Sequence, residues 1–354
     1  MSEEKLIIFP SQDFKYREWS KALKEFGIET YADSKPFIFA PFTLIALILS
    51  GKNISAYVFR YLNDKRSFVK SFLKAICDIL VSVICKFAKI KIYWILHNVD
   101  RETIVHHPKI TRLRRYLLKR VSTKIWVMDR RLLDHASSQG LDNKKLDWLC
   151  FGSPTFKKPN AETLTLREKI ISFSESIKQK YNCSNVYVGL CVSSPLAKFT
   201  HFLHAPSFVD TASSDDSVVC LVIYGKIPNY SKFSHLPEAY VTSGKILHIN
   251  HNYQIDETVL SDNIDFIYRS VNDLSVSYSV YVATAMGKPI ITHDNGFIQE
   301  MVSAYNLGLV ISNKKSNVGV SVPIFLDQWD NSNAKKFIET YTWELAAWRI
   351  SNSL

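Results

Sequence analysis

The sequence predicts an α/β protein built from two doubly wound halves, each a parallel sheet covered by helices. Short apolar segments typical of strands alternate with helical segments through residues 1–154, and the alternation starts again after residue 180. A polar helical stretch, 155–180, separates the two runs and is expected to contain a hinge. The length of 354 residues fits two domains at roughly 150 residues each.

Apolar periodicity predicts the elements of the first half. Runs rich in branched and aromatic residues predict strands at 5–10, 54–62, 91–99, 123–129 and 145–154. Helical spacing predicts helices that end at Gly27 and Gly140, and others over 66–90 and 111–120. Because each strand leads through a helix to the next, we expect parallel strands with helices on both faces. Residues 1–154 form the first predicted domain.

The second half repeats the pattern. Apolar runs predict strands at 185–192, 217–225, 245–250, 263–270 and 307–312, with a helix near 196–206. Val280–Val302 reads as a helix of small residues, a Gly-Lys-Pro stop, a short strand, an Asp-Asn-Gly turn and a second helix. We assign 155–330 to a second domain and 331–354, with a helical pattern over 334–351, to a closing segment. In doubly wound sheets, ligands lie beyond the carboxyl ends of the strands.

Charge is unevenly distributed between the halves. Residues 1–150 contain 27 basic and 15 acidic residues, whereas the remainder contains 17 and 18. A basic first half suggests an anionic partner, either membrane phosphate or nucleic acid, and a merely solvated basic face is the alternative.

The segment 66–90 predicts a strongly amphipathic, basic helix. One face carries the apolar residues Val69, Phe72, Leu73, Ile76, Leu80, Val83, Ile84 and Phe87, and the other carries Arg66, Lys70, Lys74, Asp78, Ser82, Lys86 and Lys89. Two interpretations remain open. The helix covers the core with its polar face in water, or it lies against anionic lipid headgroups.

Neither of the two most apolar stretches is expected to span a membrane. The stretch 36–51 is uncharged but about four residues short of the roughly 20 needed, and Pro41 interrupts it. The stretch 75–88 is also short and carries Asp78 and Lys86. We expect both to form buried or interfacial helices.

The six cysteines, at 77, 85, 150, 183, 191 and 220, form no close metal-ligand pair. The acidic beginning, MSEEKLIIFP, differs from a secretory signal. These features predict free thiols in a reducing cytoplasm.

Five stretches carry a family resemblance. Two of them resemble the donor domain of GT-B glycosyltransferases near family 4. The strand, loop, lysine and helix that open this domain are similar to YVGLCVSSPLAKFTHFLHA (187–205). The helix and strand that come next are similar to YQIDETVLSDNIDFIYRSVND (253–273). VATAMGKPIITHDNGFIQEMV (282–302) resembles its small-residue helix, Gly-x-Pro strand and glycine turn. YTWELAAWRI (341–350) resembles the helix that crosses back to the first domain, and YWILHNVDRE (93–102) the stretch facing the cleft. The resemblance implies two Rossmann-like domains with the cleft between them.

One feature departs from the family 4 pattern. That pattern has two glutamates eight positions apart before the small-residue helix, and here Leu274 and Val282 occupy the corresponding positions. Serines and tyrosines fill the stretch between them. The departure favours outlying GT-B families that build surface polysaccharides, several of which invert the anomeric configuration.

The resemblance also implies a set of donor-binding residues. Lys198 matches the family's phosphate-binding lysine, and Lys226 is a second cation for the diphosphate. Asn272, Ser275, Ser277 and Tyr278 stand at the proposed start of the small-residue helix, while Asn252 and Tyr253 would face the nucleobase and Glu300 matches the glutamate after the turn. The structural alternatives are surface lysines, ordinary helix capping and a satisfied polar turn. The Asp-Asn-Gly turn is expected to approach the sugar closely, because glycine has no side chain.

An acceptor hydroxyl must lose its proton to a nearby base. Asp100 and Glu102 are the preferred candidates, and Asp13 is a further possibility. His97 is also a catalytic candidate, with a role as an acceptor contact or as a hydrogen-bonded structural histidine as the alternatives. We expect no metal, since there is no convincing Asp-x-Asp loop and His106–His107 lacks a third ligand.

The leading hypothesis is therefore a metal-independent, inverting transferase that extends a lipid-linked glycan and lies on the inner face of the plasma membrane. A polyprenyl diphosphate carrier would suit the basic first half, and nucleic acid is not the expected partner. A sugar-nucleotide epimerase of the same fold and a non-catalytic basic protein that binds lipid or nucleic acid are the alternatives.

Overall fold

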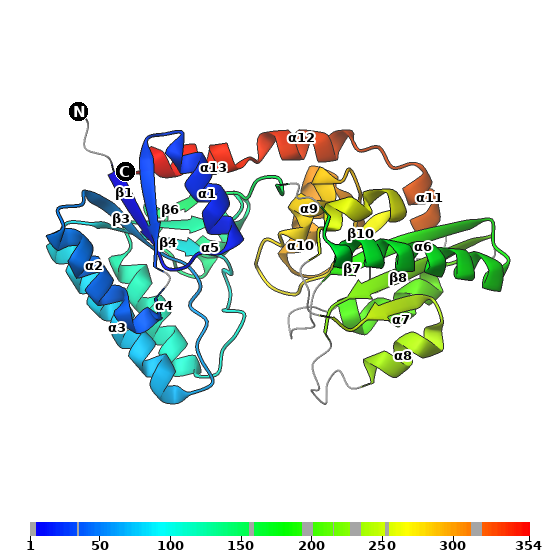
Figure 1. Cartoon of the computed structure of the whole chain (residues 1–354), viewed down its shortest axis with the longest axis horizontal. Helices are drawn as coiled ribbons and strands as arrows, with labels where there is room; N and C mark the ends of the chain where they lie inside the picture. Colours follow the sequence, from blue (N-terminus) through cyan, green and yellow to red (C-terminus); the bar gives the residue numbers. More distant parts are fainter. Residues whose placement is uncertain are drawn as a thin grey trace. The chain divides into compact units, whose positions relative to one another are not determined.

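The computed structural model describes residues 5–33, 35–155, 159–192, 201–214, 216–226, 235–251, 255–312 and 321–354. These residues form two compact units (Figure 1). The first contains the chain up to Gly152 together with Leu274–Val276 and Tyr341–Leu354, and the second contains the rest. Each unit holds a parallel sheet of six strands in the described ranges. The predicted α/β class and the two doubly wound sheets are confirmed.

The first sheet has the strand order β2-β1-β3-β4-β5-β6. Its strands are β1 (Lys5–Phe9), β2 (Ile28–Ala32), β3 (Ile54–Phe59), β4 (Lys91–Leu96), β5 (Lys124–Val127) and β6 (Leu146–Trp148). β1 pairs with β2 on one side and with β3 on the other, so the chain reverses its direction of travel across the sheet between β1 and β3. In doubly wound folds such a switch point opens the crevice that receives ligands.

Helices cover both faces of the first sheet. They are α1 (Phe14–Lys24), α2 (Ala40–Leu49), α3 (Phe68–Phe87), α4 (Pro108–Val121), α5 (Leu132–Ser138) and α13 (Trp343–Ser351), with a 3-10 turn at Phe37–Phe39. α2, α3 and α4 lie side by side on one face, whereas α1 packs with α13 on the other (Figure 1). Large aromatic side chains such as Trp19, Trp94 and Trp126 are fully buried and form the core.

α3 buries a side of mostly small residues rather than its side of large apolar residues. The buried positions hold Ser71, Ala75, Val81, Ser82 and Cys85, whereas most of the large apolar residues of the helix are exposed. Asp78 receives a 2.6 Å bond from the Arg114 guanidinium of α4, which supplies the buried charge with a partner. The interpretation of 66–90 as a helix whose apolar face covers the core is therefore wrong, because that face is largely exposed. Lys70 and Lys86 of the polar face are exposed as well.

The second sheet has the order β12-β11-β10-β7-β8-β9. Its strands are β7 (Asn185–Val192), β8 (Ser217–Tyr224), β9 (Ile246–Ile249), β10 (Phe266–Tyr268), β11 (Ile290–His293) and β12 (Gly308–Ile311). The helices of this unit are α6 (Ala161–Tyr181), α7 (His201–Ala212), α8 (Leu236–Ser243), α9 (Ser279–Ala285), α10 (Gly296–Tyr305), α11 (Ser321–Asp327) and α12 (Ser332–Thr340), with a 3-10 segment at Glu257–Asn263. β7 lies between β8 and β10, which places this unit's switch point between β7 and β10.

Two elements differ from the sequence predictions. β2 was not predicted, because IETYA is short, half polar and lies at the edge of the sheet. The closing helix is two helices, since Thr342 accepts a bond from the backbone N–H of Leu345 and starts α13 anew. The polar helical stretch 155–180 largely forms α6, as its helical pattern predicts, and α6 buries Leu166, Ile170 and Ile177 in the second unit.

Candidate active site

The carboxyl edge of the first sheet gathers the polar residues that follow β1, β3 and β4. Asp13 lies after β1 and Arg60 directly after β3, on either side of the switch point. The Arg60 guanidinium donates a 2.9 Å bond to the Asp13 carboxylate, which also caps α1 by accepting from the Tyr16 N–H at 2.8 Å. Asp13 is thus engaged by two donors. These two bonds hold the loop after β1 at the sheet edge. To act as a base, the Asp13 carboxylate would have to break its bond with Arg60.

An aromatic wall follows this ion pair. The His97 ring, directly after β4, stacks on Tyr61 with centroids 4.3 Å apart, and it lies nearly parallel to Phe151 at 6.1 Å. The Lys15 ammonium sits 4.2 Å from the centroid of Phe151 and 3.4 Å from the Tyr61 hydroxyl. Burial raises the pKa of Tyr61, against the lowering effect of Arg60, so its hydroxyl remains a neutral hydrogen-bonding group. Lys15, Arg60, Tyr61 and Phe151 were not singled out from the sequence.

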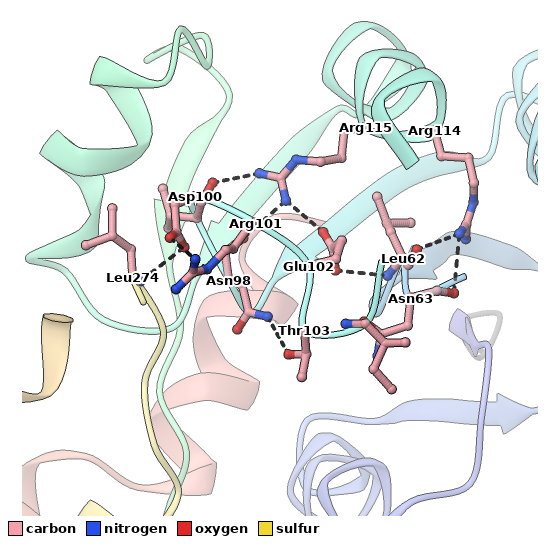
Figure 2. A network of polar contacts seen from close by, with 12 residues as sticks. Leu62, Asn63, Asn98, Asp100, Arg101, Glu102, Thr103, Arg114, Arg115 and Leu274 are labelled. Carbon is pink, nitrogen blue, oxygen red and sulfur yellow. Dashed lines mark hydrogen bonds and ion pairs between the residues drawn. The ribbon is translucent and has the colours of Figure 1, made fainter. Parts of the chain in front are cut away.

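Glu102 holds the loop after β4 through Arg115 (Figure 2). The Arg115 guanidinium donates to Glu102 Oε1 at 2.7 Å and to the carbonyl of Val99 at 2.6 Å, and Glu102 Oε2 accepts from the Leu62 N–H at 3.3 Å. Burial raises the pKa of Glu102, and the Arg115 charge counteracts this rise. Glu102 therefore fixes the loop, and its buried, paired carboxylate is poorly placed to take a proton from an acceptor.

Asp100 is the more available carboxylate of the two preferred bases. It accepts a 3.1 Å bond from the Leu274 N–H and lies 3.5 Å from the Arg101 guanidinium, with 28% of its side chain exposed. The segment Leu274–Val276 belongs to the first unit, where Leu274 lies beside Asp100 (Figure 2) and its carbonyl accepts from the Val99 N–H at 2.9 Å. This long-range pairing holds Asp100 in place while leaving part of it in contact with solvent.

Ser275 belongs to the first unit, whereas Asn272, Ser277 and Tyr278 belong to the second. It is buried and forms an antiparallel bridge with Asn98 of the first unit. Ser277 and Tyr278 lie in the turn that enters α9, where the Ser277 carbonyl accepts from the Val280 N–H at 3.1 Å, and Asn272 is exposed. The N-cap residue of α9, Tyr278, makes no side-chain capping bond.

In the second unit, the carboxyl edge at the switch point is only partly described. β7 leads into 193–200, so Lys198 lies outside the described residues, as do Asn252 and Tyr253. Lys226 follows β8 and is exposed, and Glu300 lies half-buried on α10. Two hydrogen-bonded pairs mark the ends of β10 and β11, with Tyr268 Oη 2.6 Å from His293 Nε2 and Ser270 Oγ 2.6 Å from Asn295 Oδ1.

The Asp-Asn-Gly turn has a structural reason for its glycine. Gly296 has φ of 63°, and a Cβ there would lie 1.8 Å from the Val271 carbonyl oxygen. The Phe297 N–H donates to the Asp273 carbonyl at 3.0 Å in the same contact. The close approach thus joins the turn to the loop after β10. This contact accounts for the glycine without the bound sugar that the sequence interpretation invoked.

Two ionisable residues of this unit, Arg269 and the half-buried Glu257, influence each other electrostatically. Arg269 follows β10 and is buried, and its charge acts on Glu257. Burial raises the pKa of Glu257 to about 7, with Arg269 opposing the rise.

Among the described residues, no group of three or more His, Cys, Asp or Glu is arranged to hold a metal ion.

Comparison with known proteins identifies the fold. No protein-family model and no curated protein matches the chain. The structure of HepE from Anabaena in complex with UDP matches with a TM-score of 0.64 and 11% identity over 99% of both chains. A glycosyltransferase from Rickettsia africae matches at 0.63 and 15% identity, over 99% of this chain and 98% of that one. WaaG, a glycosyltransferase involved in lipopolysaccharide biosynthesis, matches at 0.58 and 13% over 98% of both. The expected GT-B fold is confirmed.

Proposed function

We propose that the protein is a GT-B glycosyltransferase that moves a sugar from a nucleotide-sugar donor to a lipid-linked glycan. The observation that carries this proposal is the likeness over nearly the whole chain to structures that include HepE with UDP and with UDP-glucose. The product would be a surface polysaccharide, such as capsule, exopolysaccharide or lipopolysaccharide. The transfer is proposed to be hexosyl, inverting and metal-independent, on the inner face of the plasma membrane.

The second unit would bind the donor. The edge at β7 and β10 carries Lys226 after β8 and the loop that leads to Ser277 after β10. In the proposed reaction, cations and hydroxyls stabilise the negative charge that develops on the diphosphate. Lys198 and Lys226 are the proposed cations, Asn252 and Tyr253 are proposed for the base, and Glu300 supports the glycine turn.

The first unit would supply the base. The acceptor oxygen bonds to the anomeric carbon as the bond from that carbon to the diphosphate oxygen breaks, and the hydroxyl proton passes to a carboxylate. Asp100 is the preferred base because its arginine partner, Arg101, is exposed and lies 3.5 Å away, whereas Glu102 is buried against Arg115 and Asp13 is bonded to the buried Arg60 at 2.9 Å. His97, stacked in the aromatic wall, is proposed as an acceptor contact.

The first test is thermal stabilisation by UDP, GDP, CMP, dTDP and their common sugar conjugates. We expect one nucleotide to raise the Tm, and Lys198→Ala or Lys226→Ala to weaken its binding about tenfold or more, because each loses a charged hydrogen bond of roughly 1.5–3 kcal/mol. Lys178→Ala, an exposed lysine on α6, is the matched control and should bind as the wild type does. Asp100→Asn should retain nucleotide binding and lose transfer.

Other outcomes would point elsewhere. No stabilisation by any nucleotide at millimolar concentration would reject the transferase proposal, and DNA binding with a steep salt dependence would then favour a basic binding protein. Conversion of the donor sugar to its epimer without an acceptor, followed by NMR, would favour an epimerase.

A further inference from the structure

The first unit presents a large apolar surface formed by α2 and α3. These two helices lie side by side (Figure 1). We define the α2–α3 apolar face as the exposed residues Phe39, Phe42, Ile45 and Leu49 with Phe68, Val69, Phe72, Leu73, Ile76, Ile79, Leu80, Val83 and Phe87. Soluble monomers rarely expose so many contiguous large apolar side chains.

The exposure is concentrated along one side of α3. At about 100° per residue, the α3 members of the face fall within one arc of about 140°. Phe42, Phe68, Phe72 and Phe87 are 68%, 58%, 49% and 85% exposed. Because an open phenylalanine presents about 200 Å², these four rings alone expose on the order of 500 Å², near the upper limit of a typical monomer's largest patch.

Polar contacts hold α3 in this orientation. Asp78 is paired with Arg114, the Lys74 ammonium donates to the Asn63 carbonyl at 3.0 Å, and the Ser71 hydroxyl donates to the Lys65 carbonyl at 2.8 Å. Turning the helix to bury its phenylalanines would break these bonds and leave Asp78 without its arginine. The outward apolar face is therefore built into the packing of the unit.

Positive charge surrounds the face. Between Asp64 and Asp100 the sequence contains one acidic residue, Asp78, which Arg114 neutralises. Arg66, Lys70, Lys86 and Lys89 are exposed beside the face. A hollow of about 420 Å³ at the C-terminal end of α3 is lined by Lys86, Lys89, Lys91 and Arg120, next to Phe87.

We propose that the α2–α3 apolar face inserts into the acyl region of an anionic bilayer, with the surrounding lysines and arginines at the lipid phosphates. An amphipathic helix with an apolar face and cationic edges has this combination of properties. A second copy of the chain fits less well, because a two-fold contact through the same face would bring two cationic rims together.

The inserted face ends beside the loop that follows β4 at the carboxyl edge of the first sheet, where the proposed base Asp100 lies. The Phe68 ring lies 5.6 Å from the His107 ring, and Ile104 and Val105 of the intervening loop are about 40% exposed. A glycan on a membrane-anchored carrier would therefore reach the edge that holds Asp100. This inference deepens the proposed function by orienting the lipid-linked acceptor, but insertion itself is tested without any sugar nucleotide.

The test is co-sedimentation of the full-length protein with phosphatidylcholine vesicles, with and without phosphatidylglycerol, at low salt and at about 1 M salt, where the Debye length is ~3 Å. We expect binding to anionic vesicles that persists in part at high salt. Phe42→Ser with Phe87→Ser should weaken it about 100-fold, since each phenylalanine contributes about tenfold or more. Lys70→Gln with Lys86→Gln should weaken it at low salt only.

Val241→Ser with Ile324→Ser is the matched control, because both residues are exposed but lie in the second unit. This control should bind vesicles as the wild type does. Binding that vanishes at high salt and is unchanged by the phenylalanine changes would overturn insertion in favour of adsorption by charge. A dimer abolished by the phenylalanine changes, without vesicle binding, would overturn it in favour of a second copy. The rise in Tm with nucleotide, measured without vesicles, tests the donor site separately. A protein that is stabilised by nucleotide but fails to insert would overturn only the membrane proposal.

Discussion

At the residue scale, the Glu102–Arg115 pair determines how the loop after β4 responds to pH. Glu102 is 8% exposed, and burial raises its pKa above the ordinary 4.5 while Arg115 opposes the rise. Removing the arginine should raise the pKa further. Between the ordinary and the raised pKa, the folded state then binds more protons than the unfolded state, so stability falls as pH rises through that window.

We therefore predict that Arg115→Ala lowers the free energy of unfolding by about 3 kcal/mol at pH 7.5, as expected for a broken buried pair, and by clearly less near pH 5. Urea unfolding followed by tryptophan fluorescence measures this, since Trp19, Trp94 and Trp126 lie in the first unit. Glu102→Gln in the same chain should remove most of the pH dependence. An equal loss at both pH values would mean that the unpaired carboxylate is not the cause.

At the element scale, the orientation of α3 makes a prediction about stability. Ala75 is 2% exposed on the inward side, whereas Phe72 is 49% exposed. Ala75→Leu should cost about 1–3 kcal/mol by overpacking, while Phe72→Ser should change stability by about 0.5 kcal/mol or less, as for an ordinary surface site. The measurement is the urea midpoint of each variant without lipid. A larger loss for Phe72→Ser than for Ala75→Leu would show that the apolar side faces the core.

The same helix shows how far sequence alone reaches. Apolar spacing predicts a helix over 66–90 and the α3 residues lie within it, but the spacing is the same whichever side faces the sheet. The choice depends on Arg114, which lies 36 positions after Asp78 and on another helix. Likewise β2 is found only through its pairing with β1, because its own residues are half polar.

The candidate site was predictable to the same degree. Asp13, His97 and Asp100 follow strands, and the parallel topology alone brings strand ends to one edge. The partners that distinguish them come from elsewhere. Arg60 engages Asp13 across 47 positions, and Leu274 reaches Asp100 across 174. Such contacts leave no local pattern in the sequence, so the difference between an engaged and an available carboxylate emerges only from the fold.

At the scale of the whole molecule, the two units are expected to carry separate binding functions. The apolar, cationic face belongs to α2 and α3 of the first unit, and the proposed donor edge belongs to β7 and β10 of the second. No helix in the described ranges is long and apolar enough to cross a bilayer. Amide hydrogen exchange can follow both functions in one experiment.

We predict two separate footprints in that experiment. Anionic vesicles should slow exchange in 37–49 and 68–87, the segments that carry the apolar face, and UDP or the nucleotide found by thermal stabilisation should slow it in 268–278 and 293–298. Phe42→Ser with Phe87→Ser should abolish only the first footprint, because these residues lie in α2 and α3, and Lys226→Ala should reduce only the second. A nucleotide footprint on 68–87, or a vesicle footprint confined to the second unit, would contradict this division. The first outcome would mean that the basic half serves the donor, and the second would mean that the second unit meets the membrane, so in either case the charge of the first half would need a different explanation.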